Sequence, residues 1–363
     1  MHRRLAKDSR LVISLILMGG YFLLCFAYYS VFASDISTYE PAEGFFQYPL
    51  NFHDHGVYLN TIEYLKDEGF AYQFNNDIGI SAIYLATGKL MAFFGIESWE
   101  LLAFIFNSLV LFGCFILNIA ISERLGLRMK GILYFFLNFS FLYFVQLINK
   151  DILTIFFLFL AVYSGIARRM WIFILFLPLM FLVRQQLLVF GIIYLLLLPG
   201  TRPYIRIFLS YCATSIIAAI LTVNINIIGP ESLGDGFSRF LVDLNQKYYV
   251  GYLFFNFVRV LQYIYAVFSS FDFYTEARGI DVAMILRLPL IIVLLIYSRS
   301  LLLSLARFGY WLETPGKYLL LTIVAFLLAW LMNPTINARY VMLIIPIVLI
   351  FAVYASHGRK VSG

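Results

Sequence analysis

Long apolar runs separated by short polar segments make up most of the chain. Runs of about 17–25 apolar residues can cross the hydrocarbon core of a bilayer as helices. The pattern predicts such helices near residues 11–33, 99–122, 131–148, 152–167, 207–228, 282–298, 318–332 and 340–356. Residues 170–199 are apolar between two basic clusters and hold Arg184 near their middle, which favours two short helices that meet at Arg184. We therefore expect about ten crossings, with both termini on one side.

Two longer segments, residues 34–98 and 229–281, fall on the opposite side and form the expected outer loops. Residues 79–95 in the first are apolar but short and interrupted by Lys89, which is typical of a helix lying along the membrane interface. Residues 250–271 in the second are apolar enough to span. A span there would place the basic residues 299–317 outside, so we interpret 250–271 as a re-entrant or interfacial helix.

Composition supports a membrane protein. Of the 363 residues, 62% are hydrophobic and 13% are charged, and the mean hydropathy is +0.88. A soluble domain has about 45–50% apolar and about 25% charged residues. Soluble enzymes and disulfide scaffolds are excluded, and Cys25, Cys114 and Cys212 all lie in apolar runs. The predicted fold class is an all-α polytopic membrane protein, with residues 1–363 forming a single integral membrane domain and interfacial helices on its outer face.

The basic balance of the chain indicates its topology and no nucleic-acid partner. The segments on the side of both termini contain 16 Lys and Arg against three acids, and the rest of the chain contains 10 against 17. Lys and Arg concentrate in the cytoplasmic loops of membrane proteins. We therefore expect cytoplasmic termini and a site that faces the periplasm or exterior. The expected location is a bacterial inner membrane.

Ionisable residues near the bilayer are costly and often functional. The first group is His53-Asp54-His55-Gly56-Val57-Tyr58. Asp54 precedes a predicted short helix, so it is either a general base at the outer membrane surface or the N-cap of that helix. His53 and His55 could bind a divalent metal, but His-x-His alone is weak evidence, and we predict neither a metal site nor a cofactor.

Three cations at predicted helix junctions form the second group. Lys150 precedes Asp151 between two apolar runs. The two residues either meet a phosphate-bearing ligand, with Lys150 as its cation, or they simply pair at the interface or extend to water. Arg184 lies at the predicted turn and either meets a phosphate or pairs with an outer-face carboxylate. Arg339 precedes the last predicted span beside Tyr340, and its alternative is an interfacial Arg whose guanidinium extends to water.

The order of these features resembles the GT-C class of membrane glycosyltransferases, which take sugars from polyprenyl phosphate or diphosphate carriers. The resemblance covers nearly the whole chain but uses short, degenerate motifs: Asp54 to Tyr58, Phe94-Gly95, Lys150-Asp151, Arg184, and Arg339-Tyr340 followed by Pro346. The family often has two adjacent acids in its first loop, whereas Asp54 is flanked by histidines. Many members also have a soluble domain after the last span, and we expect none here. The compact layout is similar also to O-antigen and other surface-polysaccharide polymerases.

The resemblance implies transfer of a sugar or oligosaccharide from a lipid-linked donor to a glycan or lipid acceptor on the non-cytoplasmic face, in surface polysaccharide assembly. It implies Asp54 as the catalytic base and a substrate-binding group of Lys150, Asp151, Arg184, Arg339, Tyr58, His53 and His55. Membrane lipid and polysaccharide-assembly proteins are the other expected partners. The alternatives are an O-antigen-type polymerase, a flippase or transporter for a lipid-linked sugar, and a structural assembly partner. Transporters often contain two related halves, and the sequence shows no such repeat.

Overall fold

The computed structural model describes residues 2–34, 46–47, 50–69, 76–199, 202–225, 237–268, 274–275, 279–333 and 338–358, and it is almost entirely helical. The helices are α1 (His2–Phe32), α2 (Phe52–Asp67), α3 (Asn76–Ala92), α4 (Trp99–Arg124), α5 (Arg128–Phe136), α6 (Ser140–Phe144), α7 (Asp151–Ile166), α8 (Met170–Leu175), α9 (Leu177–Val183), α10 (Gln185–Leu197), α11 (Pro203–Ile225), α12 (Phe237–Tyr248), α13 (Gly251–Phe268), α14 (Val282–Ile285), α15 (Leu288–Ala306), α16 (Phe308–Leu312), α17 (Lys317–Trp330) and α18 (Ala338–Gly358).

Three very short strands connect the two predicted outer loops. They are β1 (Phe46–Gln47), β2 (Tyr274–Thr275) and β3 (Gly279–Asp281), in the order β1-β3-β2. β1 pairs with β3 in parallel, and β2 pairs with β3 in antiparallel fashion. Residues from segments 34–98 and 229–281 therefore lie side by side, which the sequence did not predict.

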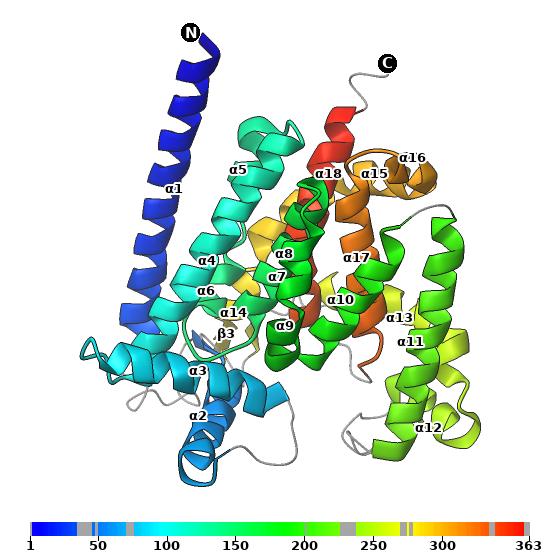
Figure 1. Cartoon of the computed structure of the whole chain (residues 1–363), viewed down its shortest axis with the longest axis horizontal. Coiled ribbons are helices and arrows are strands. Elements are labelled where there is room, and N and C mark those ends of the chain that lie inside the picture. Colours follow the sequence, from blue (N-terminus) through cyan, green and yellow to red (C-terminus); the bar gives the residue numbers. More distant parts are fainter. Residues whose placement is uncertain are drawn as a thin grey trace.

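The long helices form an upright bundle (Figure 1). The start of α1 and the end of α18 lie at the same end of this bundle, whereas α2 and α3 lie at the opposite end. α3 runs crosswise to α1 and α4, as expected for residues 79–95 if they follow a membrane surface.

Five described helices are long and apolar enough to cross a membrane: Val12–Phe32, Trp99–Arg124, Pro203–Leu221, Leu288–Ala306 and Arg339–Ser356. Asp151–Ile166, Gln185–Leu197 and Lys317–Trp330 are apolar but shorter. Large apolar side chains are exposed on the outer helices, for example Leu23 (70%), Phe208 (64%) and Ile296 (71%). Such faces suit lipid better than water. The chain is consistent with a polytopic membrane protein, and the prediction of about ten crossings is not confirmed.

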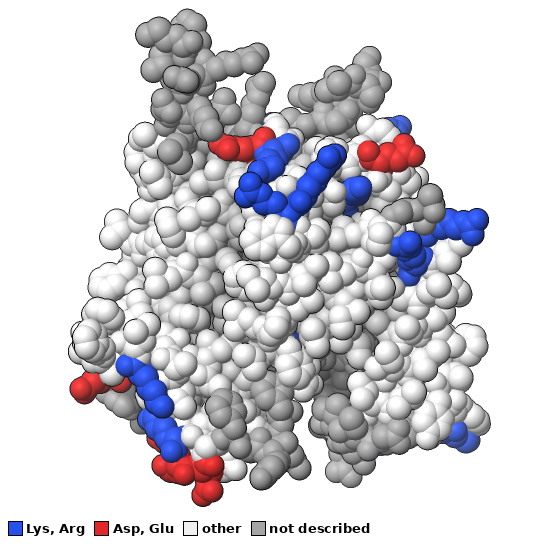
Figure 2. Space-filling model, in the orientation of Figure 1, with Lys and Arg blue, Asp and Glu red and all other residues white. Residues whose placement is uncertain are grey.

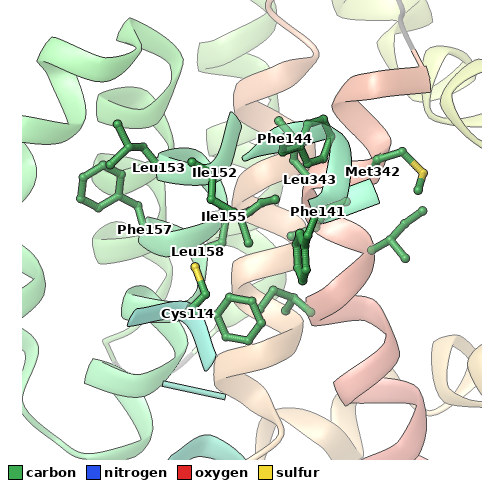
Figure 3. Packing of buried hydrophobic residues seen from close by; sticks show 14 of the residues in the cluster. Cys114, Phe141, Phe144, Ile152, Leu153, Ile155, Phe157, Leu158, Met342 and Leu343 are labelled. Atoms are coloured by element: carbon green, nitrogen blue, oxygen red, sulfur yellow. The ribbon is translucent and has the colours of Figure 1, made fainter. Parts of the chain in front are cut away.

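The core of the bundle surrounds α7. Thirteen of its 16 residues are buried, because α4, α9, α17 and α18 enclose it. Figure 3 shows Ile155 of α7, Phe141 of α6 and Leu343 of α18 in one apolar cluster. At about 1.5 Å per residue, α7 is only about 24 Å long, less than the hydrocarbon thickness of about 30 Å. A helix enclosed by protein need not match that thickness, because few of its residues face lipid.

The predicted span 131–148 is wrong. The chain forms α5 and α6 there, with a break at residues 137–139 and non-helical backbone from residue 145 to residue 150. Buried side-chain amides bind the carbonyls that the broken helix exposes: Asn107 Nδ2 donates to Leu147 O at 2.9 Å and Gln146 Nε2 to Leu142 O at 2.6 Å. Non-helical backbone in a membrane protein needs partners of this kind, since lipid supplies none.

The predicted helix pair in residues 170–199 is confirmed, with one further break. α9 ends and α10 begins at Arg184, whose backbone is extended (φ −165°, ψ 124°). A second interruption at Phe176 separates α8 from α9. Other boundaries moved modestly: the span predicted at 207–228 begins at Pro203, and the one predicted at 282–298 is divided into α14 and an α15 that continues to Ala306.

Charged side chains gather at the two ends of the bundle (Figure 2). The end that holds both termini has exposed cations at Arg124, Lys130, Arg168, Arg169, Arg202, Arg299 and Arg307. The end that holds α2 and α3 has exposed acids at Glu63, Asp67, Glu68 and Glu97, beside Lys66 and Lys89. The surface between these ends is almost free of charge in the view of Figure 2. We call the two ends the basic end and the acidic end.

Candidate functional site

Four helix starts converge near the acidic end, and each brings one charged residue that the sequence had singled out. Asp54 lies in the first turn of α2 and Asp151 is the first residue of α7. Arg184 immediately precedes α10, and Arg339 is the second residue of α18. Helix N-termini have partial positive charge, which favours carboxylates and disfavours guanidinium groups. The two acids therefore compensate both the two arginines and the helix ends.

These four residues form a continuous chain of ion pairs, which we call the charge network. Arg339 is its central member: Nη1 donates to Asp54 Oδ2 at 2.6 Å, and Nε donates to Asp151 Oδ2. Arg184 Nη2 donates to the other oxygen of Asp151, Oδ1, at 2.9 Å. Arg184 also lies over the rings of Trp330 and Tyr340, at 5.7 and 5.5 Å from their centroids.

Exposure increases along the charge network. The side chain of Asp151 is 0% exposed and that of Arg184 is 4%, whereas Arg339 is 17% and Asp54 is 27% exposed. A ligand at the surface can therefore reach Asp54 and Arg339 without rearranging the core. Arg184 pairs with a carboxylate, which was one of its two interpretations from sequence. That carboxylate belongs to Asp151 at the start of α7 and not to an acid of the outer loops. Asp151 and Arg184 form the buried half of the charge network, and Arg339 connects them to Asp54.

Lys150 belongs to a separate ion pair beside the charge network. Its Nζ lies 3.4 Å from Asp77 Oδ1 of α3 and 5.6 Å from the centroid of the Tyr58 ring. The side chain is 17% exposed. Burial and the nearby Arg184 charge lower the pKa of Lys150, against the opposing effect of Asp77. Lys150 and Asp151 therefore turn to different partners, and the alternative that they pair with each other is wrong.

Asp54 is not the N-cap of α2. Asn51 holds that position, Asp54 is the third helical residue, and Asn51 Nδ2 donates to Asp54 Oδ2 at 2.7 Å. Burial alone would raise the pKa of Asp54, but the Arg339 charge and the hydrogen bonds from Asn51 and Arg339 hold it below its ordinary value. Burial, together with the Asp54 charge, raises the pKa of Tyr58, whose hydroxyl therefore stays protonated.

The two histidines that flank Asp54 differ in burial and in their contacts. His53 is exposed, while His55 is buried and its Nδ1 accepts a hydrogen bond from the Ile148 N–H at 3.3 Å. His55 Nε2 lies 3.6 Å from Glu100 Oε1. Residues two apart on a helix point in different directions, so this pair does not converge. Across the described residues no three His, Cys, Asp or Glu side chains are placed to share a metal ion.

Sequence reasoning missed three residues that support the site. Asn107 of α4 accepts from Tyr84 at 2.7 Å and holds the backbone before Lys150. Buried Arg259 of α13 donates to the carbonyls of Leu331, at 2.8 Å, and of Asn333, just before α18. A polar residue within an apolar run was the available signal at both positions. Asp77 was visible only as one acid among many in the first outer loop.

Comparison with known proteins found no family model, no curated protein and no solved structure that matches this chain.

Proposed function

We propose that the chain is a membrane glycosyltransferase that acts at the acidic end. It transfers a sugar or oligosaccharide from a polyprenyl phosphate or diphosphate carrier to a glycan or lipid acceptor, in surface polysaccharide assembly. One observation supports this most: Asp54 and Arg339, an acid and a phosphate-compatible cation, are joined at the accessible end of a network whose other half is buried. The same residues match the motifs that resemble the GT-C class.

Cations and helix ends at this place favour a phosphate. Arg339 and Lys150 are both partly exposed, and guanidinium groups match phosphate oxygens in geometry. The starts of α7, α10 and α18 add their partial positive charges. A phosphate held here is the leaving group of the transfer. As its bond to the anomeric carbon breaks, the electron pair moves to the phosphate oxygen, and these positive groups stabilise that charge.

Asp54 is the base in this mechanism. It takes a proton from the acceptor hydroxyl while that oxygen forms a bond to the anomeric carbon. One base and one leaving group lead to inversion at the anomeric carbon. In the free protein Arg339 holds the pKa of Asp54 low, which makes Asp54 a weak base. A phosphate that draws Arg339 toward itself weakens this pairing and raises the basicity of Asp54 once donor is bound.

Transfer by the purified chain in liposomes tests the proposal. Labelled lipid-linked donor is supplied on one side only, and formation of a glycosidic bond is measured. Asp54→Asn should lower transfer by about 100-fold or more, the usual contribution of a general base. The matched control is Asp67→Asn, an exposed acid at the end of the same helix, which should keep wild-type activity. Full activity of Asp54→Asn would refute the role of the base.

A lipid-linked sugar flippase is the second candidate, because buried Asp and Arg groups inside a helical bundle also mark transport pathways. The liposome assay separates the two: a flippase moves labelled lipid across the bilayer and forms no new glycosidic bond. Product length separates a single-sugar transferase from a repeat-unit polymerase, since the polymerase yields a ladder.

The proposed orientation places the basic end in the cytoplasm of a bacterial inner membrane and the acidic end outside. Exposed cations outnumber exposed acids at the basic end, where Glu123 and Glu313 are also exposed, and this excess of cations supports the orientation. Labelling of Glu68→Cys and Arg202→Cys variants with an impermeant thiol reagent tests it. Glu68→Cys should react from the outside in intact cells, and Arg202→Cys only after permeabilisation.

A further inference from the structure

A polar cavity of about 370 Å³ opens at the basic end, far from the charge network. It lies where the end of α4, the α7–α8 junction and the turn before α17 meet. Its charged lining consists of Arg124, Arg168 and Lys317 against a single acid, Glu313. In the view of Figure 2 this end carries the densest group of Lys and Arg. The lining therefore favours an anion.

Aromatic rings hold two of these cations beside the cavity. The Arg124 guanidinium lies 5.6 Å from the Tyr163 ring centroid, and Lys317 Nζ lies 5.0 Å from the Tyr318 ring centroid. The ion pairs found among the described residues involve other cations, all near the acidic end. Among the described residues, Glu313 therefore forms no ion pair with Arg124, Arg168 or Lys317, and the lining keeps a net positive charge.

Arg168 adds an independent observation, because its backbone is unusual. Its φ is +56°, in the left-handed region that favours glycine. It ends α7 in a Schellman-type turn, where the Arg168 N–H donates to Gly165 O at 3.1 Å and the Arg169 N–H donates to Ser164 O at 2.9 Å. Glycine would adopt this conformation with less strain, yet the residue present places a guanidinium in the cavity wall. Among the described non-glycine residues with a positive φ, which are Arg168, Arg202 and Tyr249, Arg168 is the one that lines this cavity.

We propose that this cavity binds a phosphate group, and that its natural source is the headgroup of an anionic membrane lipid. Basic pockets between membrane helices bind lipid phosphates in this way. Arg124 and Arg168 supply hydrogen-bond donors in fork geometry, and Lys317 supplies a point charge. A soluble phosphate compound has the same chemistry and is the other source. The site is independent of the proposed sugar transfer, since it shares no residue with the charge network.

Native mass spectrometry of the full chain tests the proposal. Retention of phosphatidylglycerol is compared with retention of phosphatidylcholine of the same acyl chains, and inorganic pyrophosphate is the soluble probe. The variant is Arg168→Gly, which removes the charge and suits the positive φ, so that folding is preserved. The matched control is Arg202→Gly: Arg202 is also exposed at the basic end, also has a positive φ (+70°), and does not line the cavity.

Wild type should retain phosphatidylglycerol in preference to phosphatidylcholine, and Arg168→Gly should weaken that retention about fivefold, the expected effect of one cation near an anionic headgroup. Arg202→Gly should leave it unchanged. Arg124→Gln combined with Arg168→Gly should weaken it further. Pyrophosphate binding with the same variant dependence, without lipid preference, would keep the phosphate site and reject the lipid as its source. Two results would overturn the proposal. One is an equal loss of phosphatidylglycerol retention in both glycine variants. The other is equal retention of phosphatidylglycerol and phosphatidylcholine together with no binding of pyrophosphate.

Discussion

Replacing Asp151 with Asn keeps the size of the side chain and removes the charge that Arg184 and Arg339 share. Arg339 retains Asp54 as a partner, whereas the remaining ring contacts of Arg184 carry no full negative charge. The Asn oxygen can accept from one arginine, but its NH₂ group then faces the other arginine, donor against donor. The variant thus leaves buried positive charge without compensation.

Removing one partner of a buried ion pair costs about 3–5 kcal/mol in the free energy of unfolding. Because Asn keeps one acceptor and Arg339 keeps Asp54, we expect the lower part of this range. A domain of about 150–250 residues loses about 2–4 °C in melting temperature per kcal/mol, and a longer chain loses less. The apparent melting temperature of Asp151→Asn should therefore fall by about 5 °C or more.

The assay is thermal unfolding of purified protein in lipid nanodiscs at one heating rate, because membrane proteins often unfold irreversibly. Asp67→Asn is the control, an exposed acid whose loss should change the free energy of unfolding by less than about 0.5 kcal/mol. The double variant Asp151→Asn with Arg184→Gln should lose less free energy of unfolding than the two single variants lose together, because no buried charge then lacks a partner. Strict additivity, or a single variant that melts with the control, would refute the network as described.

Two further predictions concern packing and pH. A Cβ on Gly165 would lie 2.3 Å from Tyr318 Cδ1 and 2.7 Å from Tyr194 Oη, so Gly165→Ala should lower the free energy of unfolding by about 1–3 kcal/mol. The control is Gly20→Ala in α1, where a Cβ meets nothing within 4 Å and the melting temperature should stay unchanged. Equal melting curves for the two variants would contradict this packing. The folded pKa of Asp54 lies below its ordinary value of 3.8, so this carboxylate stabilises the fold above that pH, and the stabilisation is lost as the pH falls through the lower folded value. The difference in melting temperature between wild type and Asp54→Asn should narrow from about pH 5 to about pH 2, and a constant difference would argue against the pairing with Arg339.

Several features of the fold followed from sequence because their cause is local. An apolar run must avoid water, so membrane helices and their approximate limits are readable from hydropathy alone. An Arg between two apolar runs is costly inside lipid, and the helix break at Arg184 follows from that cost. The same cost marks Asp54, Lys150, Asp151 and Arg339 as candidate functional residues, although the sequence does not show which residues they contact.

The broken segment 131–148 shows where local reasoning fails. Its composition is that of a spanning helix, but its neighbours provide Asn107 and Tyr21, which bind the carbonyls that a break exposes: Asn107 donates to Leu147 O, and the Tyr21 hydroxyl donates to Asn138 O at 2.7 Å. A helix can open inside a membrane protein only where such donors are present. Their presence depends on packing against other helices.

The amino-acid sequence by itself determined that this chain belongs in a membrane, that cations are in excess on one side and acids on the other, and which few ionisable residues are candidates for a function. Only the tertiary structure decided their partners. Arg339 reaches Asp54 across 285 residues, and Arg184 meets Asp151 rather than an outer-loop acid. Hydropathy acts residue by residue and can be read along the chain. An ion pair depends on which helix ends meet, and that is settled by the packing of the whole bundle.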